Sequence, residues 1–153
     1  MLFEPKHPTD DFEGYVQVQL GNYNDVGYEA AINVPIVPDK LLVRFAGTSE
    51  SRDGYTKNLT TGQDQDDRNY ASERVSVLFR PIDDLDNLTV VDRYDSHTNG
   101  GSNHLVNVNP FATVPKLEGA LLTNALAEQQ AIGPYETLSD VQGLDKIEAM
   151  GVA

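Results

Sequence analysis

The residues of this chain that have the chemistry to bind a metal gather near position 100. His97 and His104 flank a segment rich in Gly and Asn, and Asp92 and Asp95 come just before it. Imidazole and carboxylate groups are common metal ligands, but a metal site needs fixed spacing on a rigid element. This polar segment supplies neither, so we expect solvated histidines and predict no metal site.

A second acidic group, made of Asp64, Asp66 and Asp67, has the composition of a calcium-binding loop. An EF-hand loop also needs a central glycine and a terminal glutamate, and this stretch lacks both. We therefore predict a solvated loop here.

The remaining motifs give no catalytic site. Asn58-Leu59-Thr60 and Asn87-Leu88-Thr89 match the glycosylation acceptor pattern, and we interpret both as chance matches. The serines lack a nucleophile elbow, and no glycine-rich phosphate loop follows a strand. Because no set of titratable groups converges in the sequence, we predict that the chain is not an enzyme and binds no cofactor.

Three arginines lie in stretches that read as strands, namely Arg44, Arg74 and Arg80. An isolated charge in a low dielectric is costly, so each needs a partner, for which Glu29 and Glu50 are candidates. We expect these arginines to be solvated rather than to contact a ligand.

The composition excludes several classes of protein. A chain of 153 residues with 24 acidic and 11 basic residues has a net charge of -13, which argues against a nucleic-acid partner. Cysteine is absent, so no disulfide or thiolate site is expected. No apolar run is long enough for a transmembrane helix, and the first residues, MLFEPKHPTDD, do not have the pattern of a signal peptide.

The elements that position these residues are strands in which apolar and polar residues alternate. This alternation places one set of side chains on each face of a sheet. It predicts five strands, over residues 12–23, 26–36, 41–55, 70–80 and 88–95. The apolar face carries Val16, Val18, Ile32, Val43 and Val77, and the polar face carries Gln17, Gln19, Asn33 and Arg44. The adjacent Val90 and Val91 leave the faces of the fifth strand unassigned.

The connections between these strands alternate in length. Those after the second and fourth strands are compact, whereas those after the third and fifth are longer and more polar. We therefore predict an antiparallel meander in chain order, with the short turns at one end. After Gly100 the pattern changes: residues 118–131 predict a helix, and residues 139–150 predict a second short one.

Three stretches together resemble TonB-dependent outer-membrane receptors: LFEPKHPTDDFEGYVQVQLGNYN, RDGYTKNLTTGQDQDDRNY and LFRPIDDLDNLT. The resemblance covers most of residues 1 to about 135, and it places the chain just after the plug domain of such a receptor. It implies an all-β fold, an up-and-down meander of about five strands that is part of a transmembrane β-barrel, followed by an irregular region with one or two short helices. Residues 1–11 would lead in from the plug, 12–99 would form barrel strands one to five, and 100–153 would form an extracellular loop region.

By this resemblance, the parent protein takes up a scarce solute, such as an iron-siderophore complex, with energy supplied through TonB. Its location would be the outer membrane. Its partners would be membrane lipid, the plug domain, TonB, and a small-molecule or metal-chelate ligand. Barrels of this class have many more strands than five, so we expect the chain to be a fragment. The alternative is a soluble all-β binding or adhesion module of an exported protein, which detergent dependence would distinguish.

Overall fold

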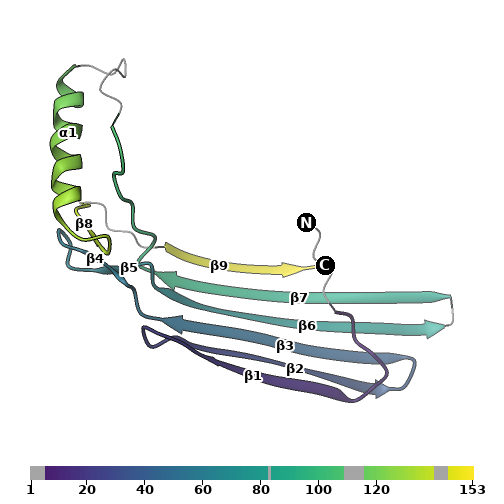
Figure 1. Cartoon of the computed structure of the whole chain (residues 1–153). Coiled ribbons are helices and arrows are strands. Elements are labelled where there is room, and N and C mark those ends of the chain that lie inside the picture. The colour runs from purple at the N-terminus through teal and green to yellow at the C-terminus, as the bar shows by residue number, and fades with distance from the viewer. Residues whose placement is uncertain (1–5, 83, 109–115, 140–144) are drawn as a thin grey trace. The chain divides into compact units, whose positions relative to one another are not determined.

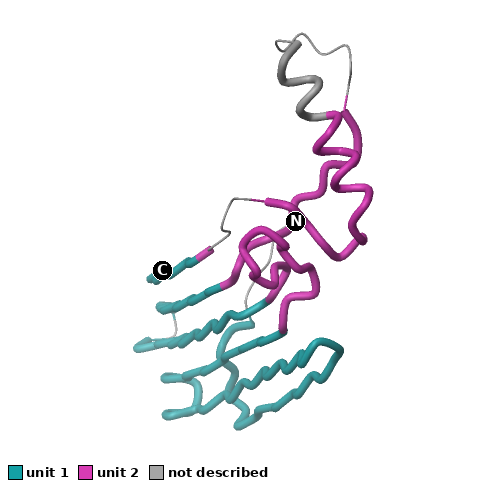
Figure 2. The backbone as a smooth tube through the Cα atoms, turned by 90° about the vertical axis from the view of Figure 1, so that its left-hand side faces the viewer, with its two compact units in different colours: residues 1–52, 68–97, 146–153 teal, residues 53–67, 98–145 magenta. Residues whose placement is uncertain are grey.

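A computed structural model describes residues 6–82, 84–108, 116–139 and 145–153 of the chain. The chain divides into two compact units, coloured separately in Figure 2. The first comprises residues 1–52, 68–97 and 146–153, and the second comprises residues 53–67 and 98–145.

The first unit is built on one large antiparallel sheet (Figure 1). Within the described residues its strands are β1 (Glu13–Leu20), β2 (Val26–Val37), β3 (Leu41–Arg52), β6 (Arg68–Ile82), β7 (Leu85–Thr98) and β9 (Asp145–Val152). They lie in the order β1-β2-β3-β6-β7-β9, so each strand pairs with the next one of the sheet in chain order. The predicted meander is confirmed.

The tight turns follow from local backbone chemistry. Between β1 and β2, Tyr23 and Asn24 both adopt positive φ, and the Gly21 N–H donates to the Asp25 carbonyl at 2.9 Å. Between β2 and β3, Asp39 has a φ of 62°. Asn and Asp tolerate this left-handed region better than most residues, which is why these positions turn the chain.

The register separates the two faces as the alternation predicts. Val34 lies opposite Val43, which lies opposite Val77, in one cross-strand row. The next row, which points to the other side of the sheet, joins Asn33, Arg44 and Ser76. The predicted assignment of residues to two faces is confirmed, and the register also settles β7, where Val91 lies on the apolar side because it pairs with Val75.

The apolar face of this sheet is uncovered in the described part of the first unit. Large apolar side chains on it remain exposed to solvent, for example Val16 at 76%, Leu20 at 75% and Tyr28 at 56%. The buried apolar residues are Ala31, Leu42 and Leu78, all of which lie on the polar side. A single layer of this kind lacks the packed second layer that soluble sheets use to bury their apolar face.

The connections have the predicted length bias. Three residues, 38–40, join β2 to β3, and residues 83–84 join β6 to β7 at the same end of the sheet. At the other end, residues 53–67 join β3 to β6, and residues 99–144 lie between β7 and β9. These two long connections supply the second unit.

The second unit contains a small three-stranded sheet and a helix. The strands β4 (Thr56–Asn58), β5 (Asp64–Gln65) and β8 (Glu136–Thr137) lie in the order β5-β4-β8. The helix α1 (Lys116–Ala131) confirms the helix predicted over residues 118–131. The rings of Tyr55 and Tyr135 meet edge to face, 6.3 Å apart between centroids.

The prediction of a second helix over residues 139–150 is wrong for the described residues, because Asp145–Val152 form β9 and residues 140–144 lie outside the description. β9 is a full strand of the large sheet: Val90 and Ala153 exchange reciprocal backbone hydrogen bonds of 2.9 and 3.0 Å, the pattern of antiparallel pairing. The region predicted to be loop therefore returns to the sheet. Every β9 side chain is exposed, so neither face of this strand needs apolar residues at alternate positions, and its sequence shows no strand pattern.

Candidate functional site

The polar face of the large sheet carries most of the arginine residues of the chain. Arginine occurs six times in the sequence, and five of these residues lie on this face. They are Arg44, Arg52, Arg68, Arg74 and Arg80. In a chain with a net charge of -13, this is a local concentration of cations.

Three of these arginines pair with carboxylates. Arg68 Nη1 lies 2.9 Å from Glu50 Oε1, Arg74 pairs with Asp92 across β6 and β7, and Arg80 Nε lies 3.2 Å from Asp86 Oδ1. The Tyr70 hydroxyl also donates to Glu50. The predicted partnership of an arginine with Glu50 exists, but it belongs to Arg68. Glu29 instead accepts from the Tyr15 hydroxyl.

Arg44 differs from the other arginines of this face. It is only 8% exposed, and its positive charge adds to the larger effect of Lys6 in lowering the pKa of Glu13. Most of Arg44 is therefore covered, but none of its guanidinium nitrogens is both buried and without a hydrogen-bond partner. Ser76 lies directly opposite on β6 and is 3% exposed, and the pair Leu42–Leu78 occupies a neighbouring row.

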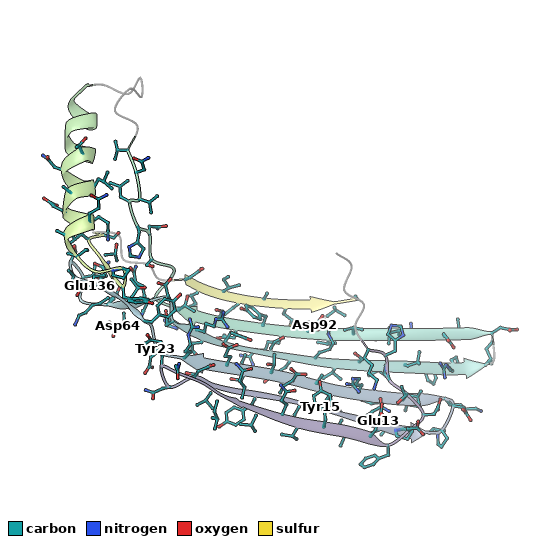
Figure 3. The ribbon with its side chains drawn as sticks, in the orientation of Figure 1. Glu13, Tyr15, Tyr23, Asp64, Asp92 and Glu136 are labelled. Atoms are coloured by element: carbon teal, nitrogen blue, oxygen red, sulfur yellow. The ribbon has the colours of Figure 1, made fainter. Side chains whose placement is uncertain are left out.

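Beside this position the polar face has a hollow of about 290 Å³. Its floor is formed by small residues, Ala46 and Gly47, which leave space above the sheet. Its walls are Tyr15, Glu29, Thr48, Ser72 and Arg74. Figure 3 labels Tyr15 on β1 and Asp92, the partner of Arg74, on β7.

The segment before β1 is fastened to the polar face by Asn33. The side chain of Asn33 is fully buried, and its Oδ1 accepts from the Thr9 N–H at 2.9 Å. Its Nδ2 donates to the carbonyls of Thr9 and Asp11, both at 2.6 Å, and also lies 2.8 Å from Thr9 Oγ1. One amide side chain thus replaces the backbone partners that a neighbouring strand would give.

A second contact holds the same segment near the tight-turn end. Asp10 Oδ1 accepts from the Asp39 N–H at 2.7 Å, and Asp10 Oδ2 lies 3.8 Å from Arg80. The chain therefore enters β1 from the polar side of the sheet, beside the short turns (Figure 1).

In the second unit, the three aspartates predicted to form a solvated loop organise the backbone instead. Asp66 accepts hydrogen bonds from both the N–H and the hydroxyl of Ser102, at 2.9 and 2.6 Å. Asp67 accepts from the Asn99 N–H at 2.7 Å, and Asn99 Nδ2 donates to the Asp64 carbonyl at 2.9 Å. Their oxygens bind residues 99–102.

The hydrogen bonds to Asp66 change the pKa of its carboxyl group. Burial acts to raise the pKa of the carboxyl group, but hydrogen bonds from Ser102 and Thr56 outweigh it, so the pKa is lowered overall. Asp66 also adopts a φ of 63°, a conformation that Asp reaches more easily than most residues.

The histidines and aspartates near position 100 do not converge. His97 lies exposed on β7 rather than in a loop, and His104 lies in the second unit, where its Nδ1 is 3.2 Å from Gln129 Nε2. Asp92 and Asp95 fall on opposite faces of β7, because they are an odd number of residues apart. Within the described residues, no group of three or more His, Asp or Glu side chains is placed to hold a metal ion.

The two glycosylation matches have different surroundings. Asn58 is fully buried, its Nδ2 donates to the Ser139 carbonyl at 2.9 Å, and its Oδ1 accepts from the Thr60 N–H at 3.0 Å. A glycan cannot be attached to this position in the folded chain. Asn87 is exposed on β7 and accepts from the Thr89 hydroxyl at 3.1 Å.

Sequence reasoning missed the structural roles of Asn33 and Asn58. Both asparagines bind partners far along the chain, Asn33 across 24 residues and Asn58 across 81. The available signal was the strand-like position of Asn33 itself, where a polar residue on a sheet face needs a partner once it is covered.

Comparison with known proteins adds no family: no family model matches the chain, and no solved structure matches it. Among the described residues, no helix is both long and apolar enough to cross a membrane.

Proposed function

We propose that this chain forms the first barrel strands and an external loop of a TonB-dependent outer-membrane receptor. The observation that carries the proposal is the uncovered apolar face of a single-layer antiparallel sheet, opposite a face rich in charged and hydrogen-bonding side chains. A strand between lipid and a wet lumen must alternate in this way. Phe45 at 48% and Phe79 at 47% exposure are side chains that lipid would cover.

Two further features support this orientation. The two shortest connections, β2 to β3 and β6 to β7, lie at one end of the sheet. The other end has the five-residue turn 21–25 and both long connections, a bias in length like that between periplasmic turns and extracellular loops in outer-membrane barrels. The segment held by Asn33 lies on the polar face, which is where a chain arriving from a plug inside the lumen has to run.

The role in uptake rests on the stretches that resemble the receptor family. The parent would import a scarce solute, such as an iron-siderophore complex, with energy from TonB. The polar face would line the lumen, and the second unit would stand outside the cell. In a barrel, both β1 and β9 would pair with further strands, because an open edge leaves backbone groups unsatisfied in lipid.

A flotation assay tests the lipid-facing role. The refolded chain is mixed with phosphatidylcholine vesicles and centrifuged through a density gradient, with a detergent-free sample alongside. We expect the chain to float with the vesicles and to aggregate without lipid or detergent. A sharp monomer peak in detergent-free buffer, with a cooperative thermal transition and no flotation, would instead identify the soluble all-β module.

A further inference from the structure

We propose that lipid covers the apolar face of the large sheet as an oblique band, with Glu73, Arg93 and Asp95 at the level of the phospholipid headgroups. The strands would then be tilted by about 35–50° from the membrane normal. These three charged residues lie on the same side of β6 and β7 as Val75 and Val91. The inference rests on the proposed function and deepens it, because it names the level at which the lipid tails end.

The first argument is that the apolar surface ends at a different level on each strand. On β1, the side chains of this face stay apolar and exposed as far as Leu20, which is 75% exposed. Through β2 and β3, the register aligns Leu20 with Asn69 of β6. On β6, the last large apolar residue in this direction is Val75, and the exposed Glu73 follows. The border therefore lies about five residues closer to the tight turns on β6 than on β1.

This displacement corresponds to a definite tilt. Five residues span about 17 Å along a strand, and the three strand spacings from β1 to β6 span about 14 Å. A membrane plane that follows this border makes the strands lie about 50° from its normal, close to the tilt of about 35–45° that closure of a barrel imposes.

The second argument is that the tight turns are displaced in the same direction. The Arg80 N–H donates to the Lys40 carbonyl at 2.8 Å, so the turn between β2 and β3 lies level with Arg80. β6 continues past this level to Ile82, which pairs with Leu85. The turn between β6 and β7 therefore lies about 7–10 Å further from the long connections. Since turns on one side of a membrane lie near one level, this displacement indicates a tilt of the same sense.

The third argument is the placement of charge. Glu73 and Arg93 are exposed and directly opposite each other on β6 and β7, and Asp95 follows on the same side of β7. A charged side chain that faces lipid is costly at the midplane but not near the headgroups. The Arg93 guanidinium also matches the oxygens of a lipid phosphate. Between this border and the tight turn, Asn87 and Thr89 share the same side of β7, and the Thr89 hydroxyl donates to Asn87 Oδ1 at 3.1 Å.

Depth measurements on spin labels test the tilt. The full chain contains no cysteine, so Val18→Cys on β1, and Ala71→Cys and Val75→Cys on β6, each carry a single label in phosphatidylcholine nanodiscs. Val18 and Ala71 belong to one cross-strand row, which runs through Tyr28 and Ser49. None of the three substitutions removes a charge from the border. The depth of each label follows from its accessibility to oxygen, which dissolves in lipid, and to a water-soluble nickel chelate.

We expect the labels at positions 18 and 75 to lie within about 3 Å of one depth, and the label at position 71 to lie about 8–11 Å closer to water, because three strand spacings at this tilt produce that difference. Strands along the membrane normal would instead place positions 18 and 71 at one depth and position 75 about 14 Å away from both. That result overturns the oblique band while the lipid-facing role stands. Exclusion of all three labels from lipid overturns both.

Discussion

The hydrogen bonds of Asn33 predict how firmly the segment before β1 is held on the polar face. Asn33→Ala removes one hydrogen bond that Oδ1 accepts and two that Nδ2 donates. Three acceptors surround Nδ2, but its two hydrogens are counted as one bond each. At about 1 kcal/mol net for each bond, docking of residues 9–11 weakens by about 3 kcal/mol. Since 1.4 kcal/mol corresponds to a tenfold change, the population of the released segment rises by about two orders of magnitude.

Amide hydrogen exchange measures this release directly, because the Thr9 N–H donates to Asn33. We expect its protection to fall about a hundredfold in Asn33→Ala. The Asp39 N–H should lose protection too, because its acceptor, Asp10, belongs to the same segment. The Gly62 N–H, which donates to the Asn58 carbonyl in the second unit, should not change.

Asn87→Ala is the matched control, since Asn87 is also an asparagine of this sheet but is exposed, and its side chain accepts a hydrogen bond from the nearby Thr89. Its substitution should leave Thr9 protection as in the wild type. Unchanged protection of Thr9 in Asn33→Ala would refute the reasoning, because some other contact would then hold the segment.

Three further predictions concern the second unit. Gly54→Ala should destabilise this unit by about 1–3 kcal/mol in thermal unfolding, because the new Cβ would lie 2.5 Å from the Gln65 carbonyl oxygen. Gly151→Ala is the control and should be neutral, because its new Cβ would meet no atom within 4 Å. The lowered pKa of Asp66 means that its stabilisation is present above the unfolded pKa, about 3.9, and is lost as the pH falls through the folded value. Ser102 amide protection should therefore decrease in acid, and a flat profile would contradict this. Asn58→Ala should cost about 2–4 kcal/mol, since a fully buried amide loses its partners, and a cost below 1 kcal/mol would argue against that role.

The sheet was predictable because its signal is local. Alternation in β1, β2, β3 and β6 fixes which residues share a face, and turn residues such as Asn24 and Asp39 fix where the chain reverses. These patterns need no knowledge of distant partners, and the meander and the two faces followed from them.

The features that the sequence did not predict depend on contacts between residues far apart in the chain, or belong to a strand with no buried face. β9 is exposed throughout, so a helix and a strand were equally compatible with the local sequence of residues 145–152. The partner of Glu50 turned out to be Arg68, which comes from a stretch predicted to be loop and is placed by the extension of β6. Arg44 is buried by the packing of separate segments, so the residues next to it in the sequence do not indicate its burial.

The central claim is that the apolar face of the large sheet contacts lipid, and site-directed labelling tests it most directly. The sequence contains no cysteine, so Val18→Cys and Gln19→Cys each carry a single label on adjacent residues of β1, one on each face. Both positions are exposed, so neither label disturbs a packed core. In lipid nanodiscs we predict that a lipid-soluble quencher reaches the label at position 18 several-fold more readily than the label at position 19, and that a water-soluble quencher shows the reverse. Equal access at the two positions would contradict the account.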